Sequence, residues 1–305
     1  LQGDRLLDGV TVLDGLAVAG DEGWRQSSVR TVSGGYATEP IEVLCPGPGA
    51  AHDCMSFSLR QALKNVPERG LILMRAGIYR EGARVMRPAR ILAEPGAVMD
   101  GGAVEGKGAL VVNDNLTLEG LECRNVSVSD GNGTCVRHQR GDAILINVHF
   151  HDSQMGILAG PKGNATHILD SYIHDSGSDG LGQLGHNVYV SNRELRFERS
   201  WSLSARNGGH EIKSRASRTI IQGSLIASLN ARDSRLVDVP NAGLLEITDS
   251  VLGEGPRSEN WGLIGYGLEV RDRGLPHDDN RIVISSNTVY LDRPQGARLL
   301  QQQRA

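Results

Sequence analysis

Aromatic residues and charge of one sign are both scarce in this sequence of 305 residues. Only 4% of the residues are aromatic, and the formal net charge is −4 with a pI near 6.2. A charge so close to balance gives no general attraction to nucleic acid, so we expect no nucleic-acid partner. No apolar run approaches the roughly 20 residues that a membrane helix needs, so we expect no membrane span. The sequence leaves the oligomeric state open.

The sequence also has no methionine at its first position and no two cysteines separated by only two residues. The sequence starts at Leu1, which fits a mature secreted or periplasmic protein without its signal peptide. No C-x2-C spacing is present, which makes a zinc site less expected. Instead, Cys45 and Cys54 flank one Gly-rich loop, and Cys123 and Cys135 flank another. We expect disulfides within each pair, as in an oxidising compartment, with four buried or free thiols as the alternative.

Glycine is abundant, at 39 residues, and this bears on the fold class. Each glycine inside a helix costs about 1 kcal/mol relative to alanine, so the composition suits a helical bundle poorly. Many glycines together with few aromatic residues are typical of a chain that turns often and stacks thin layers.

A short pattern recurs along the chain: a small or polar residue, a β-former, a polar residue and a turn. Its copies start at positions 121, 148, 171, 200, 224, 250 and 287, so neighbouring copies lie between 23 and 37 residues apart. Periods in the twenties indicate one supersecondary unit per repeat. Short strand-like runs separated by Asp-Gly, Gly-Asn and Asn-Gly turns predict an all-β solenoid with two or three strands per coil. Leucine-rich repeats share the period, but their L-x-x-L-x-L frame is absent.

A helix is expected immediately before the coils, over residues 56–66. Apolar residues with helical spacings of three and four lie in this segment: Phe57, Leu59, Ala62, Leu63 and Val66. Such an amphipathic helix would cap the open end of a solenoid and shield its first coil. We therefore expect three segments, namely an N-terminal extension over residues 1–50, a β-helix domain over 51–295 and a C-terminal tail over 296–305.

The expected helix is followed by Ala76-Gly-Ile-Tyr-Arg-Glu81 and then by the coils. This arrangement resembles the bacterial right-handed parallel β-helix proteins of the pectate-lyase-like superfamily. The resemblance covers roughly residues 50–295 and implies a right-handed parallel β-helix. It implies less about function, because the superfamily includes lyases, epimerases, hydrolases, esterases and phage tailspikes.

Two consecutive coils carry polar segments at a strand position where a purely structural coil would carry apolar residues. His186 and His210 are 24 residues apart, and so are Tyr189 and Lys213. This spacing is one coil, so each pair should occupy neighbouring strands about 4.8 Å apart. The preceding coil is apolar at this position, so we expect the polar patch to end there.

The third coil adds Arg235 beside His210 and Asp238 beside Lys213. Alternation predicts that these side chains point outward together: Asn187, Tyr189, Glu211, Lys213 and Arg215. The two histidines follow a glycine at the strand start, where alternation is least reliable. The sequence therefore predicts an exposed polar row across three coils.

This combination of side chains suits proton abstraction from a uronic acid. The reaction needs a cation beside the carboxylate, a base for the C5 proton, and an acid for the leaving oxygen or for the opposite face. Arg215, Lys213 and Arg235 could hold the carboxylate, His210 or Lys213 could be the base, and Tyr189 could be the acid. A lysine is a usable base only where neighbouring cations or burial favour its neutral form.

The row also resembles the Tyr/His/Lys/Arg set of β-helix alginate and other polyuronate lyases and epimerases. The resemblance implies catalytic roles for Lys213, His210, Tyr189, Arg215 and His186. We expect substrate-binding roles for Asn187, Glu211, Arg235 and Asp238. The expected activity is a β-elimination lyase acting on an acidic polysaccharide or oligosaccharide. No acidic cluster for an essential calcium ion is evident, so we expect no cofactor, with calcium as the alternative.

Other interpretations of the same residues stay open. A C5-epimerase shares the proton abstraction, and a non-catalytic solenoid would use the row only to bind saccharide. A glycoside hydrolase needs two carboxylates, for which Glu211 and Asp238 are candidates. His149, His151, His167 and His174 form a separate histidine set. His151 and His174 occupy the same repeat position, each before an aspartate and a turn, so we expect them to make hydrogen bonds in the turn rather than to bind metal.

Overall fold

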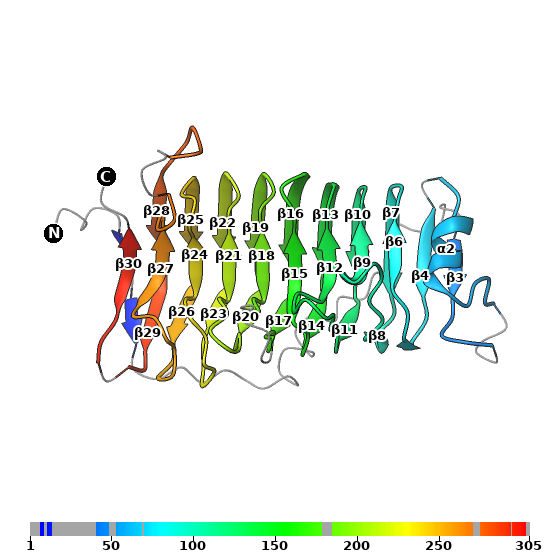
Figure 1. Cartoon of the computed structure of the whole chain (residues 1–305), viewed down its shortest axis with the longest axis horizontal. Coiled ribbons are helices and arrows are strands. Elements are labelled where there is room, and N and C mark those ends of the chain that lie inside the picture. Colours follow the sequence, from blue (N-terminus) through cyan, green and yellow to red (C-terminus); the bar gives the residue numbers. More distant parts are fainter. Residues whose placement is uncertain are drawn as a thin grey trace.

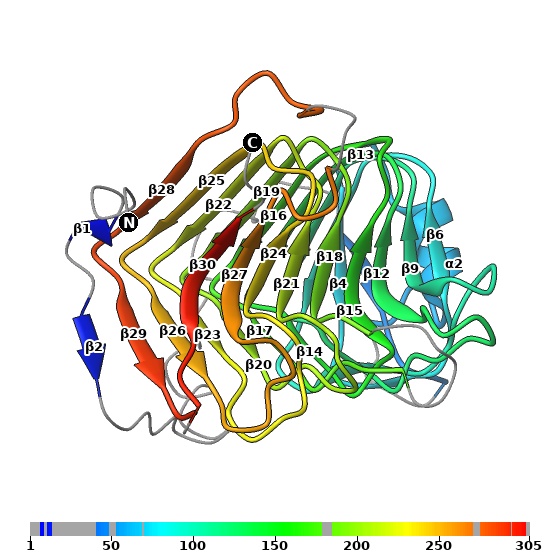
Figure 2. The same ribbon diagram turned by 60° about the vertical axis from the view of Figure 1, so that its left-hand side comes forward.

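The computed structural model describes residues 7–8, 11–13, 41–48, 53–68, 70–178, 185–270, 275–293 and 295–302. Most of the expected N-terminal extension lies outside these residues. The described chain is a right-handed parallel β-helix, as predicted. Three parallel sheets run along the molecule and form three faces around one core (Figures 1 and 2). We call them sheets A, B and C, in the order in which each coil enters them.

The strands of each sheet follow in their order of pairing. Sheet A contains β1 (Leu7–Asp8), β28 (Ile282–Ser285), β25 (Leu244–Thr248), β22 (Arg218–Gln222), β19 (Glu194–Glu198), β16 (Gly163–Leu169), β13 (Gly141–Ile146), β10 (Leu116–Glu119), β7 (Ala89–Ala93), β4 (Leu71–Met74) and β3 (Ile41–Leu44). Sheet B contains β2 (Thr11–Leu13), β29 (Thr288–Leu291), β26 (Val251–Glu254), β23 (Leu225–Ala227), β20 (Trp201–Leu203), β17 (Tyr172–His174), β14 (His149–His151), β11 (Glu122–Arg124), β8 (Ala97–Asp100) and β5 (Gly77–Tyr79). Sheet C contains β30 (Arg298–Gln302), β27 (Gly262–Tyr266), β24 (Val237–Val239), β21 (Ile212–Ser214), β18 (Val188–Val190), β15 (Met155–Ala159), β12 (Thr134–His138), β9 (Gly108–Val112) and β6 (Ala83–Val85).

A ladder of buried hydroxyl groups explains the recurring serine of the sequence repeat. The backbone N–H of Ser171 donates to Ser200 Oγ at 3.0 Å, and that of Ser200 donates to Ser224 Oγ at 3.2 Å. The ladder continues from Ser224 to Ser250 Oγ at 3.1 Å and from Ser250 to Asn287 Oδ1 at 2.9 Å. Each of these residues stands where sheet A turns into sheet B. The repeat therefore marks the corner at which the coils are joined by hydrogen bonds.

The same corner requires a residue with left-handed backbone geometry. Gly120 and Gly223 occupy it with φ of 79° and 59°, and Asn147, Asp170 and Asp249 occupy it with φ between 49° and 52°. Glycine adopts this region freely, and Asn and Asp tolerate it because their short side chains bond locally. The need for one such residue per coil accounts for part of the glycine content.

Helix α2 (Leu59–Asn65) confirms the expected capping helix and lies at the end of the stack beside β3 and β4 (Figure 1). It begins later than residue 56 because Ser58 is its N-cap, where the side chain accepts the N–H of Gln61 at 3.1 Å. Leu59, Ala62 and Leu63 of the helix are buried in the core.

Sheet pairing extends past the expected domain boundaries at both ends. Strand β3, within the expected extension, pairs with β4, and β30, within the expected tail, pairs with β27. Strands β1 and β2 pair with β28 and β29 in the last coil. The stack is therefore longer than residues 51–295.

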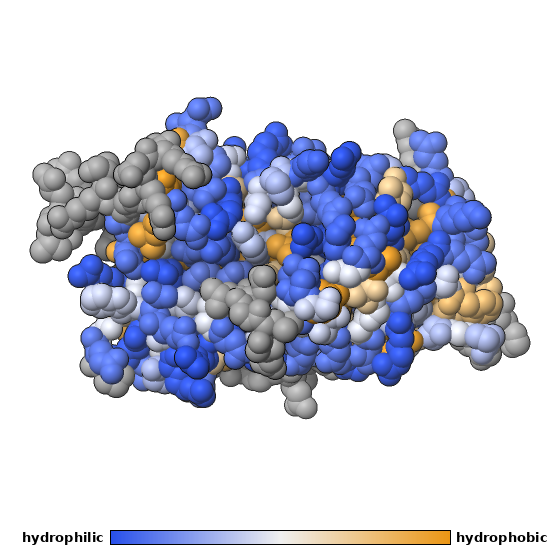
Figure 3. Space-filling view, in the orientation of Figure 1, coloured by the Kyte–Doolittle hydropathy of each residue, from blue (hydrophilic) through white to orange (hydrophobic). Residues whose placement is uncertain are grey.

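Buried Val, Ile and Leu side chains fill one continuous core along the axis of the solenoid. Both expected disulfides form, Cys45–Cys54 and Cys123–Cys135, with Cα atoms 5.7 and 5.8 Å apart. The face seen in Figure 3 is mostly hydrophilic, with hydrophobic patches across the middle coils and near α2. No helix in the described part of the chain has the length and apolar character to cross a membrane.

Candidate functional site on sheet C

Strands β18, β21 and β24 bring the predicted polar row together. Tyr189 pairs in register with Lys213, and Lys213 with Asp238, as their spacings of 24 and 25 residues predict. In β18 and β21 the residues on either side of Tyr189 and Lys213 are buried, so these two side chains leave the sheet on its outer face. Sheet C thus carries Tyr, Lys and Asp side by side on adjacent strands.

Two cations of this row converge on one carboxylate. Lys213 Nζ lies 3.3 Å from Glu269 Oε1, and Arg215 Nη2 lies 2.6 Å from Glu269 Oε2. Lys213 Nζ is also 3.5 Å from Asp238 Oδ2. Lys213 lies in β21 and Arg215 directly follows this strand, so their charged ends can share a single anionic group.

Arg215 is held in place by two further partners. Its Nε donates to Tyr189 Oη at 2.9 Å, and its Nη1 donates to Asn241 Oδ1 at 2.8 Å. A guanidinium that donates to a phenol oxygen favours the negative charge that develops if the phenol gives up its proton. Arg215 is therefore placed to bind an anion with one edge and to assist Tyr189 with another.

The two carboxylates of the site have pKa values displaced in opposite directions. Burial raises the pKa of Asp238 above its usual range, although Lys213 and Arg235 oppose this. Burial also acts to raise the pKa of Glu269, but the hydrogen bond from Arg215 and the charge of Lys213 outweigh it and lower that pKa. As pH falls, Asp238 therefore takes up a proton before Glu269 does.

His186 and His210 form a buried stack beside this row. Their rings are parallel with centroids 5.0 Å apart. The N–H of His210 donates to His186 Nδ1 at 2.8 Å, and the N–H of Arg235 donates to His210 Nδ1 at 3.1 Å. Since Nδ1 is the acceptor in both rings, the neutral rings carry their proton on Nε2.

This tautomer does not suit the expected role of His210 as a base. Burial, reinforced by nearby charges including Lys213, lowers the pKa of His186 to about 3 and that of His210 well below its ordinary value. The Nε2 atom of His210 lies 3.5 Å from Asp238 Oδ2 and faces it as a donor. His186 instead meets the ring of Tyr189 edge-on, with centroids 5.4 Å apart. Both histidines are placed to position the outward side chains.

Asn187 and Glu211, expected to point outward, instead lie inside the solenoid with no exposed surface. Asn187 Nδ2 donates to Glu211 Oε2 at 2.6 Å, and the N–H of Ala205 donates to Glu211 Oε1 at 2.7 Å. The outward orientation was wrong because the regular strands begin only at Val188 and Ile212, so alternation does not apply one residue earlier. These two residues stabilise the coils and do not face a ligand on sheet C.

Arg235 is turned toward the end of the solenoid. Its Nη2 donates to Gln301 Oε1 of β30 at 2.8 Å. It lies over Gly265, where an added Cβ would stand 2.9 Å from Arg235 Nε and 2.6 Å from Asp238 Oδ1. The absence of a side chain at Gly265 therefore makes room for both groups.

Glu269 and Asn241 belong to the site but were not predicted. The repeat could have located both, since Asn241 follows Arg215 by 26 residues and Glu269 follows it by 54. These separations correspond to about one and two coils. Both residues follow the end of their strand, beyond the part where alternation identifies an outward side chain.

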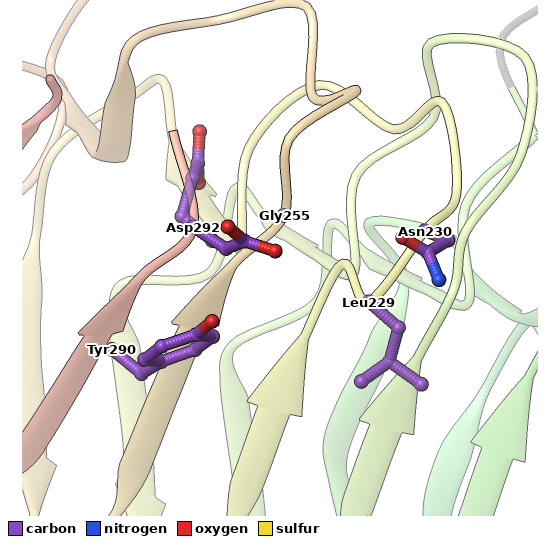
Figure 4. A pocket seen from close by; sticks show the side chains of 7 residues that line it. Leu229, Asn230, Gly255, Tyr290 and Asp292 are labelled. Atoms are coloured by element: carbon purple, nitrogen blue, oxygen red, sulfur yellow. The ribbon is translucent and has the colours of Figure 1, made fainter. Parts of the chain in front are cut away.

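A second group of acids is buried near the last coils, beside a hollow of about 110 Å³. Figure 4 shows Tyr290 and Asp292 on one side of this hollow and Leu229 and Asn230 on the other. Glu254 also lines it, is fully buried, and pairs with Arg293 Nη1 at 3.0 Å. Burial, together with the charge of Asp233, raises the pKa of Glu254 to about 7.

This shift predicts that Glu254 destabilises the fold as pH rises. Between its unfolded pKa near 4.5 and its folded pKa of about 7, the folded state holds more protons than the unfolded state. The free energy of unfolding should therefore fall by about 3 kcal/mol from this group across that window. The free energy of unfolding, measured with denaturant at several pH values, should fall less steeply with pH in Glu254→Gln than in the wild type. The surface control Glu259→Gln should keep the wild-type slope. An unchanged slope in Glu254→Gln would contradict this assignment.

Comparison with known proteins supports the fold. No protein-family model matches the sequence, and no curated protein sequence matches it. Among solved structures, the chain is similar to pectate lyase Pel9A, with a TM-score of 0.53 and 16% sequence identity. The match covers 76% of this chain and 69% of that chain. At this identity the similarity shows a shared β-helix fold.

Proposed function

We propose that this protein is a carbohydrate-active enzyme that cleaves an acidic polysaccharide by β-elimination after removal of the C5 proton of a uronic acid. The observation that carries the proposal is the shared contact of Lys213 and Arg215 with the Glu269 carboxylate. A uronate carboxylate has the same charge and geometry and could take this place. Similarity in fold to a pectate lyase supports the substrate class, and two disulfides support a secreted or periplasmic location.

In this mechanism Arg215 binds the substrate carboxylate and makes the C5 proton more acidic. Lys213 must first lose its ammonium proton to solvent, and its neutral amine is then the base. Neutral Lys213 then takes the C5 proton. The electrons of the C5–H bond form the C4–C5 double bond, and the bond from C4 to the glycosidic oxygen breaks. Tyr189 donates its proton to the leaving oxygen, and Arg215 stabilises the resulting phenolate.

The direct test is the ultraviolet absorbance of the unsaturated product. The protein should be incubated with alginate, pectate, glucuronan and acidic exopolysaccharides, and one of them should give a steady rise. A C5-epimerase would give no rise but would exchange the C5 hydrogen for deuterium in D2O. Saccharide binding with neither signal, and with no new reducing ends, would leave a non-catalytic solenoid and overturn the proposal.

A glycoside hydrolase is the second candidate, because the pKa values of Asp238 and Glu269 are pushed apart. Hydrolases pair a carboxyl group that keeps its proton with one that stays charged. Asp238 Oδ2 and Glu269 Oε1 both lie within 3.5 Å of Lys213 Nζ, so the two carboxylates share one site. The pair expected from the sequence, Glu211 with Asp238, does not serve because Glu211 is enclosed. New reducing ends without ultraviolet absorbance would favour the hydrolase.

A further inference from the structure

A second cluster of chemically active side chains lies on the outer face of sheet B, away from the sheet C site. Glu122 of β11 pairs in register with His149 of β14, and His151 is two residues further along the same strand. An oxygen of Glu122 and one ring nitrogen of each histidine all lie within 4.8 Å of one another. Phe150, between the two histidines, points into the core, so the histidines leave the strand on one side.

Neighbouring aspartates orient two of the imidazole rings in this region. His151 Nδ1 lies 2.7 Å from Asp152 Oδ2, and His174 Nδ1 lies 2.6 Å from Asp175 Oδ2. An aspartate that accepts from Nδ1 fixes the proton there and leaves the lone pair of the neutral ring on Nε2. Histidines that bind metal ions are usually held in this way by a carboxylate on the other nitrogen. The expected hydrogen bonds at the turns are therefore present and also direct the Nε2 atoms.

The Nε2 atoms point toward other ligand-type atoms. His151 Nε2 lies 3.4 Å from Glu122 Oε1, and His149 Nε2 lies 2.8 Å from His174 Nε2. Ligand atoms bound at 2.0–2.1 Å around a tetrahedral ion stand roughly 3.3 Å apart, so the Glu122–His151 separation matches two ligands of one ion. Two imidazoles and a carboxylate are donors that suit Zn²⁺ and similar divalent transition metals.

We propose that Glu122, His149 and His151 bind one divalent transition-metal ion of the zinc class, with His174 as the nearest further donor. The site is partly accessible, since the side chains of Glu122 and His151 retain 17% and 12% of their exposure. The aspartates that orient His151 and His174 also line a hollow of about 720 Å³, together with Arg206. This site is on a different sheet from the proposed lyase site, and neither proposal depends on the other.

Calorimetric titration of the EDTA-treated full-length protein with ZnCl2 tests the proposal. We expect one equivalent to bind, more weakly at pH 5.5 than at pH 7.5 because protons compete for imidazole nitrogens. Glu122→Gln and His151→Asn should each weaken binding at least about 10-fold. His167→Asn is the matched control, because His167 Nε2 also faces a carboxylate, Glu194, at 3.3 Å, but on sheet A. This control should bind zinc as the wild type does.

A second readout separates loss of the ion from loss of the fold. Zinc should raise the unfolding temperature of the wild type and of His167→Asn, and circular dichroism should show that each variant keeps its strand content. In folded His151→Asn the zinc-dependent rise should be reduced or absent. The proposal fails if the wild type does not bind zinc, if the double variant Glu122→Gln/His151→Asn binds as tightly as the wild type, or if His167→Asn loses binding to the same degree.

Discussion

Replacement of Lys213 by methionine is expected to lower the rate of unsaturated-product formation by about 100- to 10,000-fold, the range that a positioned acid or base contributes. Methionine keeps much of the length of lysine but can neither take the C5 proton nor contact the substrate carboxylate. The loss should fall mainly on kcat, because Arg215 remains to bind the carboxylate. The measurement is the initial rate of ultraviolet absorbance on whichever polyuronate the wild type cleaves.

Lys107→Met is the matched control for this experiment. Lys107 Nζ lies 3.3 Å from Glu105 Oε2, the same distance as Lys213 Nζ from Glu269, but it precedes β9, three strands along sheet C from Tyr189 in β18. The control should retain wild-type activity because a surface ion pair contributes little to stability. Equal rates for Lys213→Met and wild type would remove Lys213 from the mechanism and leave the row on sheet C as a binding surface.

Replacement of Phe150 by alanine should destabilise the protein by about 3–5 kcal/mol, the range for buried phenylalanines. Phe150 is fully buried, and its strand neighbours on either side are Cys123 of β11 and Ile173 of β17. Because each coil contacts only the next ones, neighbouring strands cannot close the cavity without losing their register. The measurement is the midpoint of denaturant unfolding, followed by circular dichroism.

Phe57→Ala makes the same chemical change at a phenylalanine that retains 46% of its exposure. Its effect should stay within about 0.5 kcal/mol, as for most surface substitutions. A similar loss at both positions would mean that removal of the aromatic ring, rather than burial, determines the effect. A small loss at Phe150 would mean that the coil around β14 can repack.

The sequence carries enough periodicity to predict the fold and the neighbours across coils. Recurrent serines mark one fixed corner of the coil, so their spacing also places residues elsewhere in it. For this reason Tyr189, Lys213 and Asp238 could be aligned from their spacing, and the disulfide pairs followed from sequence proximity. Both inferences use only distances along the chain, which a repeat converts directly into neighbours in space.

Side-chain direction at the ends of short strands could not be predicted in the same way. The strands of sheet C are only three residues long at β18, β21 and β24, so each begins or ends within a residue or two of its polar positions. Beyond the regular part of each strand, close contacts between neighbouring coils decide which way a side chain points. An added Cβ on Gly209 would overlap the carbonyl oxygen of Gly185, so the chain crosses very close to the coil below immediately before His210 and Glu211.

The pairing of β1 with β28 and of β2 with β29 joins segments from near the two ends of the sequence. Contacts so distant along the chain close a loop that contains most of the sequence, and their entropic cost is met only after most other coils are in place. The interior coils, in contrast, can assemble through contacts between residues that are only about one repeat apart in the sequence. We therefore expect β1 and β2 to dock last during refolding and to open first under mild denaturant, as hydrogen exchange at their backbone amides would show.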